Sequence, residues 1–165
     1  MDLTATKPSE TSNEGRTAFI EFVRKAGEVD PATLPGLVDR AILLVTIYDG
    51  DSLIGTAAVK RPSARYRSKT FKKVGDENAA AAHLVEIGWV HVRSDYEGNG
   101  HGRRLVEAAL KQSGSDGVYA KTKNDTMRRM LAKLGFTAVG KDYASKLKPD
   151  EKLSLFAREP IKADK

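Results

Sequence analysis

The apolar positions of this chain recur with a helical period in some segments and form continuous strand-like runs in others, which predicts an α+β fold. The first half contains a helix predicted at residues 12–26 and strands predicted at 41–48 and 53–59. Asp49-Gly50 joins these strands and is the strongest hairpin signal in the sequence, so the strands are expected to be antiparallel. Residues 1–11 are polar with little to bury, which favours a disordered tail before a folded domain at 12–165.

The second half alternates strands and helices. Residues 83–92, which include the only Trp, predict a third strand, and Gly98–Gly102 interrupts the pattern before a helical face begins. A glycine-rich turn is expected there because a strand leads into a helix N-terminus. The remaining predicted elements are short helices within 32–40 and 66–73, a strand at 118–121, a helix capped by Asn124, and closing strands at 136–139 and 152–157.

The composition fits one domain, because the 165 residues are 40% hydrophobic and 30% charged. No cysteine is present, which excludes disulfides, a thiolate nucleophile and cysteine-ligated clusters. His83, His91 and His101 fit no metal-ligand spacing, so no metal is expected and all three are expected at the surface. The sequence shows neither a membrane-length apolar run nor a secretory leader, so a cytoplasmic protein without a membrane partner is expected.

Charge is concentrated in one segment. Residues 60–73 hold seven basic side chains and no acidic one, while the net charge of the whole chain is +6. This local excess favours an anionic partner, although a solvated loop explains it equally well. Because Tyr66 and Phe71 are interleaved with the cations, nucleic-acid contact by phosphate pairing and base stacking also stays open.

The turn Gly98–Gly102 is a candidate anion site. Backbone N–H groups in such a turn approach phosphate oxygens closely, and the following helix adds partial positive charge. The P-loop is excluded because no Gly-Lys-Ser/Thr follows, and the dinucleotide fingerprint is excluded because Gly98, Gly100 and Gly102 alternate. A tight strand-to-helix turn without a ligand is the alternative.

Two segments together resemble the GNAT superfamily of N-acyltransferases. Residues 90–105, VHVRSDYEGNGHGRRL, resemble its acyl-CoA-binding segment. Residues 124–136, NDTMRRMLAKLGF, are similar to its later asparagine, helix and Leu-Gly-Phe ending, and the resemblance extends over roughly residues 12–158. It implies a mixed, mostly antiparallel sheet flanked by helices. The sheet is expected to be split between the strand ending at Val92 and the strand beginning near Val118, so that acyl-CoA lies in the opening.

The resemblance implies acetyl-CoA as cosubstrate and the residues that would hold it. Backbone groups of Val90 and Val92 are expected to pair with pantetheine, and Asn124 is expected to contact or orient the pantetheine arm. The amides of one turn are expected to hold the pyrophosphate, namely those of Gly98, Asn99, Gly100, His101, Gly102 and Arg103. Without a ligand, the valines would be ordinary core residues and Asn124 an ordinary helix cap.

Two departures from the family pattern concern charge and proton transfer. Glu97 stands where Arg or Gln usually opens the glycine turn, and its charge is unfavourable beside a pyrophosphate unless it points to solvent. Leu131 aligns with the tyrosine that commonly protonates the departing thiolate, so the usual acid is missing. Tyr143 is the candidate replacement, with Tyr66, Tyr96 and Tyr119 as alternatives.

Glu86 is the candidate general base. The acceptor amine must lose a proton from an ammonium whose ordinary pKa is about 10.4 before it attacks a thioester. Glu86 lies in an otherwise apolar strand, where desolvation would raise its pKa toward useful base strength. A structural ion pair with a buried Arg or Lys is the alternative role.

The favoured function is transfer of an acetyl group from acetyl-CoA to an amine of a small-molecule or macromolecular acceptor by direct attack. The basic segment is expected to form one wall of the acceptor site and to favour an acidic acceptor, with Arg61, Arg65 and Tyr66 in contact with it. Two alternatives stay open: an acetyltransferase directed to tRNA or DNA, and a non-catalytic CoA-binding module.

Overall fold

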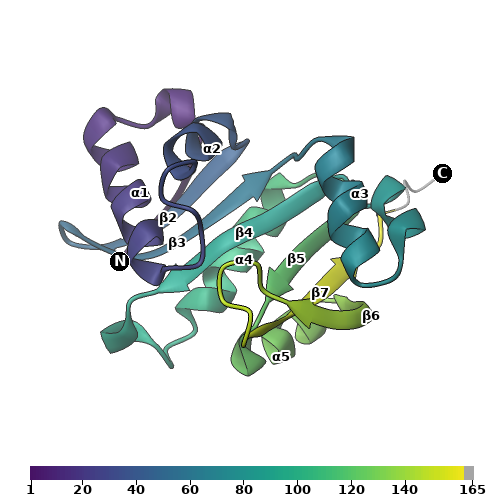
Figure 1. Cartoon of the computed structure of the whole chain (residues 1–165). Coiled ribbons are helices and arrows are strands. Elements are labelled where there is room, and N and C mark those ends of the chain that lie inside the picture. The colour runs from purple at the N-terminus through teal and green to yellow at the C-terminus, as the bar shows by residue number, and fades with distance from the viewer. Residues whose placement is uncertain (162–165) are drawn as a thin grey trace. The chain divides into compact units, whose positions relative to one another are not determined.

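The computed structural model describes residues 1–161, which form two compact units (Figure 1). Unit 1 comprises Met1–Lys60 and Ile87–Gln112, and unit 2 comprises Arg61–Glu86 and the residues from Ser113 onward. Strand β4 (Val85–Val92) contributes its first two residues to unit 2 and the others to unit 1.

Unit 1 is a strand layer packed against helices. Its other elements are β1 (Asp2–Thr6), α1 (Asn13–Ala26), α2 (Leu34–Arg40), β2 (Leu43–Asp49), β3 (Ser52–Lys60) and α4 (His101–Gln112), with short 3-10 turns at Pro8–Glu10 and Ser94–Tyr96. Figure 1 shows α1 and α2 side by side. Both contribute apolar side chains to a core that also includes Leu44, Ala58 and Trp89.

Local signals account for the helix and hairpin of unit 1. Helix α1 begins at Ser12, whose Oγ accepts a hydrogen bond from the Gly15 amide at 3.0 Å, and it ends at Gly27 with a φ of +72°. Strands β2 and β3 are antiparallel, and Gly50 adopts a φ of +59° in the turn between them. The predicted first helix and hairpin are confirmed.

The expected disordered tail at residues 1–11 is wrong. Asp2–Thr6 forms β1, which pairs antiparallel with β2, and Pro8–Glu10 forms a 3-10 turn. Thr4 lies opposite Thr46, and their hydroxyls are 3.0 Å apart. Backbone pairing and a threonine pair across the ladder stabilise this strand although it buries little apolar surface.

Unit 2 is built around three antiparallel strands. Its elements are α3 (Ala64–Lys73), β5 (Val118–Thr122), α5 (Asp125–Lys133), β6 (Thr137–Ala144) and β7 (Lys152–Arg158), with a 3-10 turn at Glu77–Ala81. Strand β7 lies between β5 and β6, and the first two residues of β4 pair with β5 in parallel. The buried apolar side chains of this unit are Phe71, Val74, Ala80, Tyr119, Leu155 and Ala157.

A bulge in β6 fixes the C-terminal end of α3. The β6–β7 register shifts between Val139 and Tyr143, and Gly140 has a φ of +58° within this interval. The Lys141 amide donates a hydrogen bond to the Val74 carbonyl at 2.9 Å, directly after α3 ends. A Cβ at Gly140 would lie 1.9 Å from that carbonyl oxygen, so the close approach requires glycine.

The predicted fold class is confirmed. The strands follow the order β1-β2-β3-β4-β5-β7-β6 in a seven-stranded, mostly antiparallel sheet in which β4 and β5 are parallel. The α-helices flank strands in both units. None of the helices within residues 1–161 combines the length and the apolar composition that crossing a bilayer demands.

Candidate functional site

Glu86 and Tyr119 lie at the buried end of a group of polar side chains in unit 2. The two residues lie opposite each other in the parallel ladder of β4 and β5. Glu86 is 2% exposed and Tyr119 is fully buried. Burial raises the pKa of the Tyr119 phenol, and the negative charge of Glu86 raises it further, so Tyr119 stays protonated near neutral pH.

Lys121 extends this group along β5. It lies two residues after Tyr119 and therefore on the same face of the strand. Its Nζ donates a hydrogen bond of 2.7 Å to the Tyr66 hydroxyl and lies 5.2 Å from the centre of that ring. Burial alone would lower the pKa of Lys121, but the Glu86 carboxylate and the nearby tyrosines outweigh it and raise that pKa.

Tyr143 and Lys73 complete the group from β6 and α3. The Nζ of Lys73 lies 5.6 Å from the centre of the Tyr143 ring. Burial raises the pKa of Tyr143, and the positive charge of Lys121 opposes that rise. Burial and the repulsion of neighbouring lysines, Lys121 foremost, lower the pKa of Lys73. We call the set Glu86, Tyr119, Lys121, Tyr66, Tyr143 and Lys73 the Glu86 cluster.

The basic segment is divided between structural and exposed side chains. Arg61 forms an ion pair with Asp116 (3.1 Å), and the Arg67 guanidinium donates to the Ala80 carbonyl at 2.7 Å. Arg65 is exposed. Of the three expected acceptor contacts, the structure brings Tyr66 into the Glu86 cluster, whereas Arg61 is held by Asp116.

Phe71 does not have the exposure that base stacking requires. Its side chain is fully buried, 5.6 Å from the His83 ring in a stacked arrangement and 5.1 Å from the Tyr119 ring edge-on. The expectation that Phe71 is available to stack on a nucleic-acid base is therefore wrong. Tyr66, at 42% exposure, is the aromatic side chain of this segment that reaches solvent.

The glycine-rich turn of unit 1 fits an anion. Gly98 and Gly100 have φ values of +82° and +80°, and a Cβ at either position would meet open space. Helix α4 begins at His101, and its first backbone bond runs from the Arg104 amide to the Gly100 carbonyl at 3.1 Å. Helix geometry leaves the preceding amides without an intrahelical acceptor, so they are suited to phosphate oxygens.

The side chains of this turn have other contacts. The Asn99 amide group donates to the carbonyl oxygens of Tyr96 (3.2 Å) and Glu97 (3.4 Å), which braces the turn. Arg103 pairs with Glu107 at 2.6 Å, one helical turn along α4. Glu97 is exposed, which reduces its unfavourable effect on a bound anion. The amides, rather than the side chains, are therefore the groups suited to an anion here.

The remaining expected cofactor contacts lie on β4 and at the start of α5. Val90 and Val92 are half-buried. Just before them, Trp89 has a φ of +51°, and its carbonyl accepts a hydrogen bond of 2.8 Å from the Thr56 hydroxyl. Asn124 is the N-cap of α5, where its Oδ1 accepts from the Met127 amide at 3.1 Å. The predicted helix cap at Asn124 is thus confirmed, and its expected contact with pantetheine stays a prediction.

The expected surface position of the histidines is wrong for two of them. His83 and His101 are 3% and 7% exposed, and the Nδ1 of His83 lies 2.7 Å from the Ala79 carbonyl oxygen. Within residues 1–161, the structure has no group of three His, Asp or Glu side chains arranged to hold a metal ion. Leu131, at the position of the family's usual acid, is fully buried and apolar.

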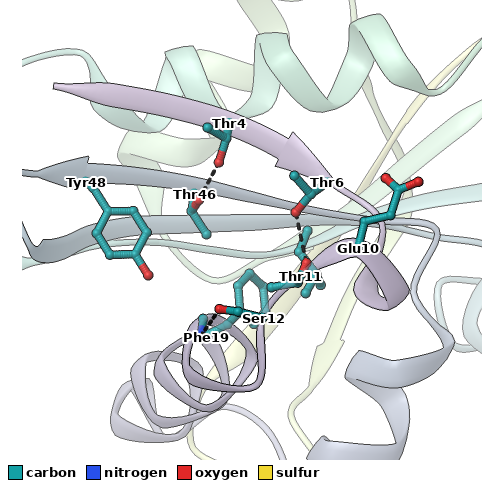
Figure 2. A pocket seen from close by; sticks show the side chains of 10 residues that line it. Thr4, Thr6, Glu10, Thr11, Ser12, Phe19, Thr46 and Tyr48 are labelled. Carbon is teal, nitrogen blue, oxygen red and sulfur yellow. Dashed lines mark hydrogen bonds between the residues drawn. The ribbon is translucent and has the colours of Figure 1, made fainter.

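A polar hollow in unit 1 is separate from these candidate residues. It encloses about 260 Å³ and is lined mainly by β1, β2 and the start of α1 (Figure 2). Its threonine hydroxyls bond to one another, Thr4 with Thr46 at 3.0 Å and Thr6 with Thr11 at 2.9 Å (Figure 2). None of the candidate residues predicted from the sequence lines this hollow.

Sequence reasoning missed Lys121, Lys73 and the contact of Tyr119 with Glu86. The strand at 118–121 was expected, so its alternation already placed Tyr119 and Lys121 on one face. The parallel register that sets Tyr119 against Glu86 had no signal in the sequence. In the sequence, nothing distinguishes Lys73 from the other basic residues of its segment. Its distinct surroundings in the structure depend on the β6 bulge.

Comparisons with solved structures agree on the fold. An acyl-CoA N-acyltransferase from Pseudomonas aeruginosa matches with a TM-score of 0.70 at 17% identity, covering 95% of this chain and 98% of the other. Escherichia coli ElaA matches with a TM-score of 0.71 at 17% identity, and the match covers 96% of this chain and 99% of the other. Salmonella typhimurium yncA, solved with its cofactor acetyl-CoA, matches with a TM-score of 0.70 at 14% identity, and the match covers 100% of this chain and 98% of the other.

Comparison with curated proteins finds no match. The sequence model of the acetyltransferase (GNAT) family matches residues 10–136, which is most of the chain. The protein therefore belongs to the GNAT family and is an acetyl-CoA-dependent N-acetyltransferase.

Proposed function

We propose that the protein acetylates a primary amine by direct attack and that Glu86 is its general base. One observation carries the proposal: a buried carboxylate lies within electrostatic reach of a lysine ammonium in unit 2. Most buried carboxylates need such compensation to stay ionised. An ionised carboxylate in a desolvated place accepts a proton from the acceptor's ammonium, directly or through one water.

Lys121 acts on Glu86 rather than on the reacting atoms. Its ammonium favours the charged form of Glu86, and Glu86 favours the charged form of Lys121, because the interaction is mutual. The ion-pair role considered for Glu86 is therefore compatible with the base role. In this proposal Lys121 is a positioning residue whose positive charge favours the ionised carboxylate.

Tyr143 is the proposed acid. A thiolate with an ordinary pKa of about 8.5 takes up a proton readily at pH 7, so even a weak acid can protonate the leaving group. The half-buried phenol of Tyr143 has a raised pKa and is protonated, as an acid must be. Tyr66 competes for this role, because its oxygen accepts from Lys121 and its O–H is left to donate elsewhere. Comparing Tyr143→Phe with Tyr66→Phe separates the two.

The proposed acetyl-CoA contacts in unit 1 are backbone groups. The amides from Gly98 to Arg103 would hold the pyrophosphate, and the backbone of Val90 and Val92 would pair with pantetheine. Asn124 would add a contact through the part of its side chain that does not cap α5. Bound acetyl-CoA supplies a thioester carbonyl that is reactive toward a neutral amine.

An amine on a nucleic acid is the second candidate acceptor. The exposed part of α3 favours it, since Arg65, Lys69 and Lys72 point outward beside the exposed Tyr66. The burial of Phe71 leaves one aromatic ring rather than two for stacking. Retention on tRNA or duplex DNA that falls steeply with salt supports this acceptor, and salt-independent retention argues against it.

Thiol release from acetyl-CoA in the presence of pooled small amines tests the function. We expect release that depends on both the protein and the amines. Acetyl-CoA should also raise the melting temperature, because a ligand at a hundredfold excess over Kd stabilises the native state by about 2.7 kcal/mol. A melting temperature unmoved by millimolar acetyl-CoA would overturn the assignment of the glycine turn.

A further inference from the structure

We propose that the acceptor carries an anionic group in addition to its amine and that Lys73 and Lys121 bind that group. The inference rests on the proposed function, since it assigns this subsite to the acceptor of the Glu86 reaction. It replaces the expected contacts of Arg61 and Arg65 with two lysines of the Glu86 cluster.

The two lysines lie on separate elements, and the β6 bulge anchors the end of α3, which carries Lys73. Lys121 lies on β5 and is held by the Tyr66 hydroxyl at 2.7 Å. Lys73 is the last residue of α3, next to Val74, whose carbonyl accepts the Lys141 amide of β6 at 2.9 Å. This contact holds Lys73 against the Tyr143 ring, with 5.6 Å between Nζ and the ring centre.

Positive charge is in excess at this place. Lys73 experiences repulsion from Lys121, Lys146 and Lys69, and it makes no ion pair with any of residues 1–161. A bound anion would offset this repulsion between the lysines, so the excess positive charge favours anion binding.

Three acidic side chains of unit 2 have other contacts. Asp116 pairs with Arg61 at 3.1 Å, and Glu151 pairs with Lys123 at 2.7 Å. Asp142 accepts a hydrogen bond of 2.7 Å from the Ser154 hydroxyl. Within residues 1–161, no carboxylate forms an ion pair with Lys73, and a ligand anion would supply the missing negative charge.

The chemistry defines the acceptor class. Ammonium groups bind a carboxylate or phosphate oxygen at about 2.7–2.9 Å, and the Tyr66 and Tyr143 hydroxyls can add neutral hydrogen bonds. Because Glu86 belongs to the same cluster, the reacting amine and the anion would belong to one small molecule, an amino acid or an aminoalkyl phosphate. A polycationic amine would be repelled by the same lysines.

Matched amine pairs test the inference. We would compare 4-aminobutyrate with 4-aminobutanamide, and 2-aminoethyl phosphate with ethanolamine, so that each pair differs in the anion. The native protein should prefer the anionic member of a pair by about tenfold or more in kcat/KM. The pair with the larger preference shows whether the subsite binds a carboxylate or a phosphate. Lys73→Met should remove most of this preference by raising KM. Lys133→Met is the control, because Lys133 is an exposed lysine of α5 in the same unit and lies outside the cluster and the exposed face of α3.

Two outcomes overturn the inference while leaving the function intact: equal use of both members of each pair, or an unchanged preference in Lys73→Met. Calorimetric titration of the same anionic amines in the presence of coenzyme A gives a readout without turnover, and no binding of either would also overturn it. Failure of the proposed function is distinguishable, because it would abolish amine-dependent thiol release and acetyl-CoA binding in the native protein.

Discussion

Replacing Gly140 with alanine should destabilise unit 2 through a clash that no side-chain rotation can relieve. The new Cβ would lie 1.9 Å from the Val74 carbonyl oxygen and 2.8 Å from its carbonyl carbon. Both are backbone atoms at the end of α3, so either the β6 bulge or the helix end must move. The Lys141–Val74 hydrogen bond of 2.9 Å would be lost or lengthened.

The expected cost can be worked out from three effects. The φ of +58° disfavours an alanine by about 1–2 kcal/mol. Overpacking against backbone adds about 1–3 kcal/mol, and a lost hydrogen bond adds about 0.5–1.5 kcal/mol. The free energy of unfolding should therefore fall by about 2.5–6.5 kcal/mol, a large part of a typical domain's stability.

Gly75→Ala is the matched control for this variant. Gly75 has a φ of +85°, and a Cβ there would meet nothing within 4 Å. It should cost only the backbone effect, about 1–2 kcal/mol. Urea unfolding followed by circular dichroism gives both free energies, provided that the transitions have the same slope. If Gly140→Ala costs no more than Gly75→Ala, the close contact between β6 and α3 is wrong, and so is the positioning of Lys73.

Three further variants test other parts of the site. Lys121→Met should cost about 2–4 kcal/mol by removing a positive charge that stabilises the Glu86 carboxylate. Adding Glu86→Gln to the same chain should restore at least about 1 kcal/mol, and additive losses in urea would refute the pairing. Because the Lys121 pKa is raised in the folded state, its contribution is present below about pH 10.4 and is lost as the pH rises through the folded pKa. Gly100→Glu should abolish stabilisation by acetyl-CoA in a thermal shift assay, whereas Gly114→Ala, at another open glycine of positive φ, should preserve it. Asn124→Ala should lower stability by about 1 kcal/mol through loss of the α5 cap, and Asn124→Ser should restore that stability. If the KM for acetyl-CoA stays raised in Asn124→Ser, the pantetheine contact is supported, and a native KM in that variant contradicts it.

Local signals in the sequence predicted most of the elements. The Asp49-Gly50 turn and the capping residues Ser12 and Asn124 act within a few residues, so the hairpin and two helices followed from adjacent sequence. Strand β1 did not, because its stability depends on pairing with β2 more than 40 positions away, as in the contact of Thr4 with Thr46. Polar composition alone cannot distinguish such an edge strand from a disordered tail.

The candidate site was predictable one residue at a time rather than as a group. Glu86 was identifiable because a carboxylate inside an apolar strand is unusual. Its neighbour Lys121 depends on the β4–β5 register, and the separation of Arg61 from the cluster depends on its ion pair with Asp116. These are tertiary contacts between residues more than 30 positions apart, so charge counting assigned the whole basic segment a single role.

The kinetics of Glu86→Gln test the central claim most directly. Turnover and acetyl-CoA affinity would be measured on one preparation, with Glu77→Gln as a control because Glu77 is an exposed acid of unit 2 outside the cluster. The account predicts that kcat falls about 10²- to 10⁴-fold at pH 7, that acetyl-CoA affinity is nearly unchanged, and that activity partly recovers at high pH as the amine loses its own proton. Native turnover at pH 7 in Glu86→Gln would contradict the account and leave Glu86 as the ion-pair partner of Lys121.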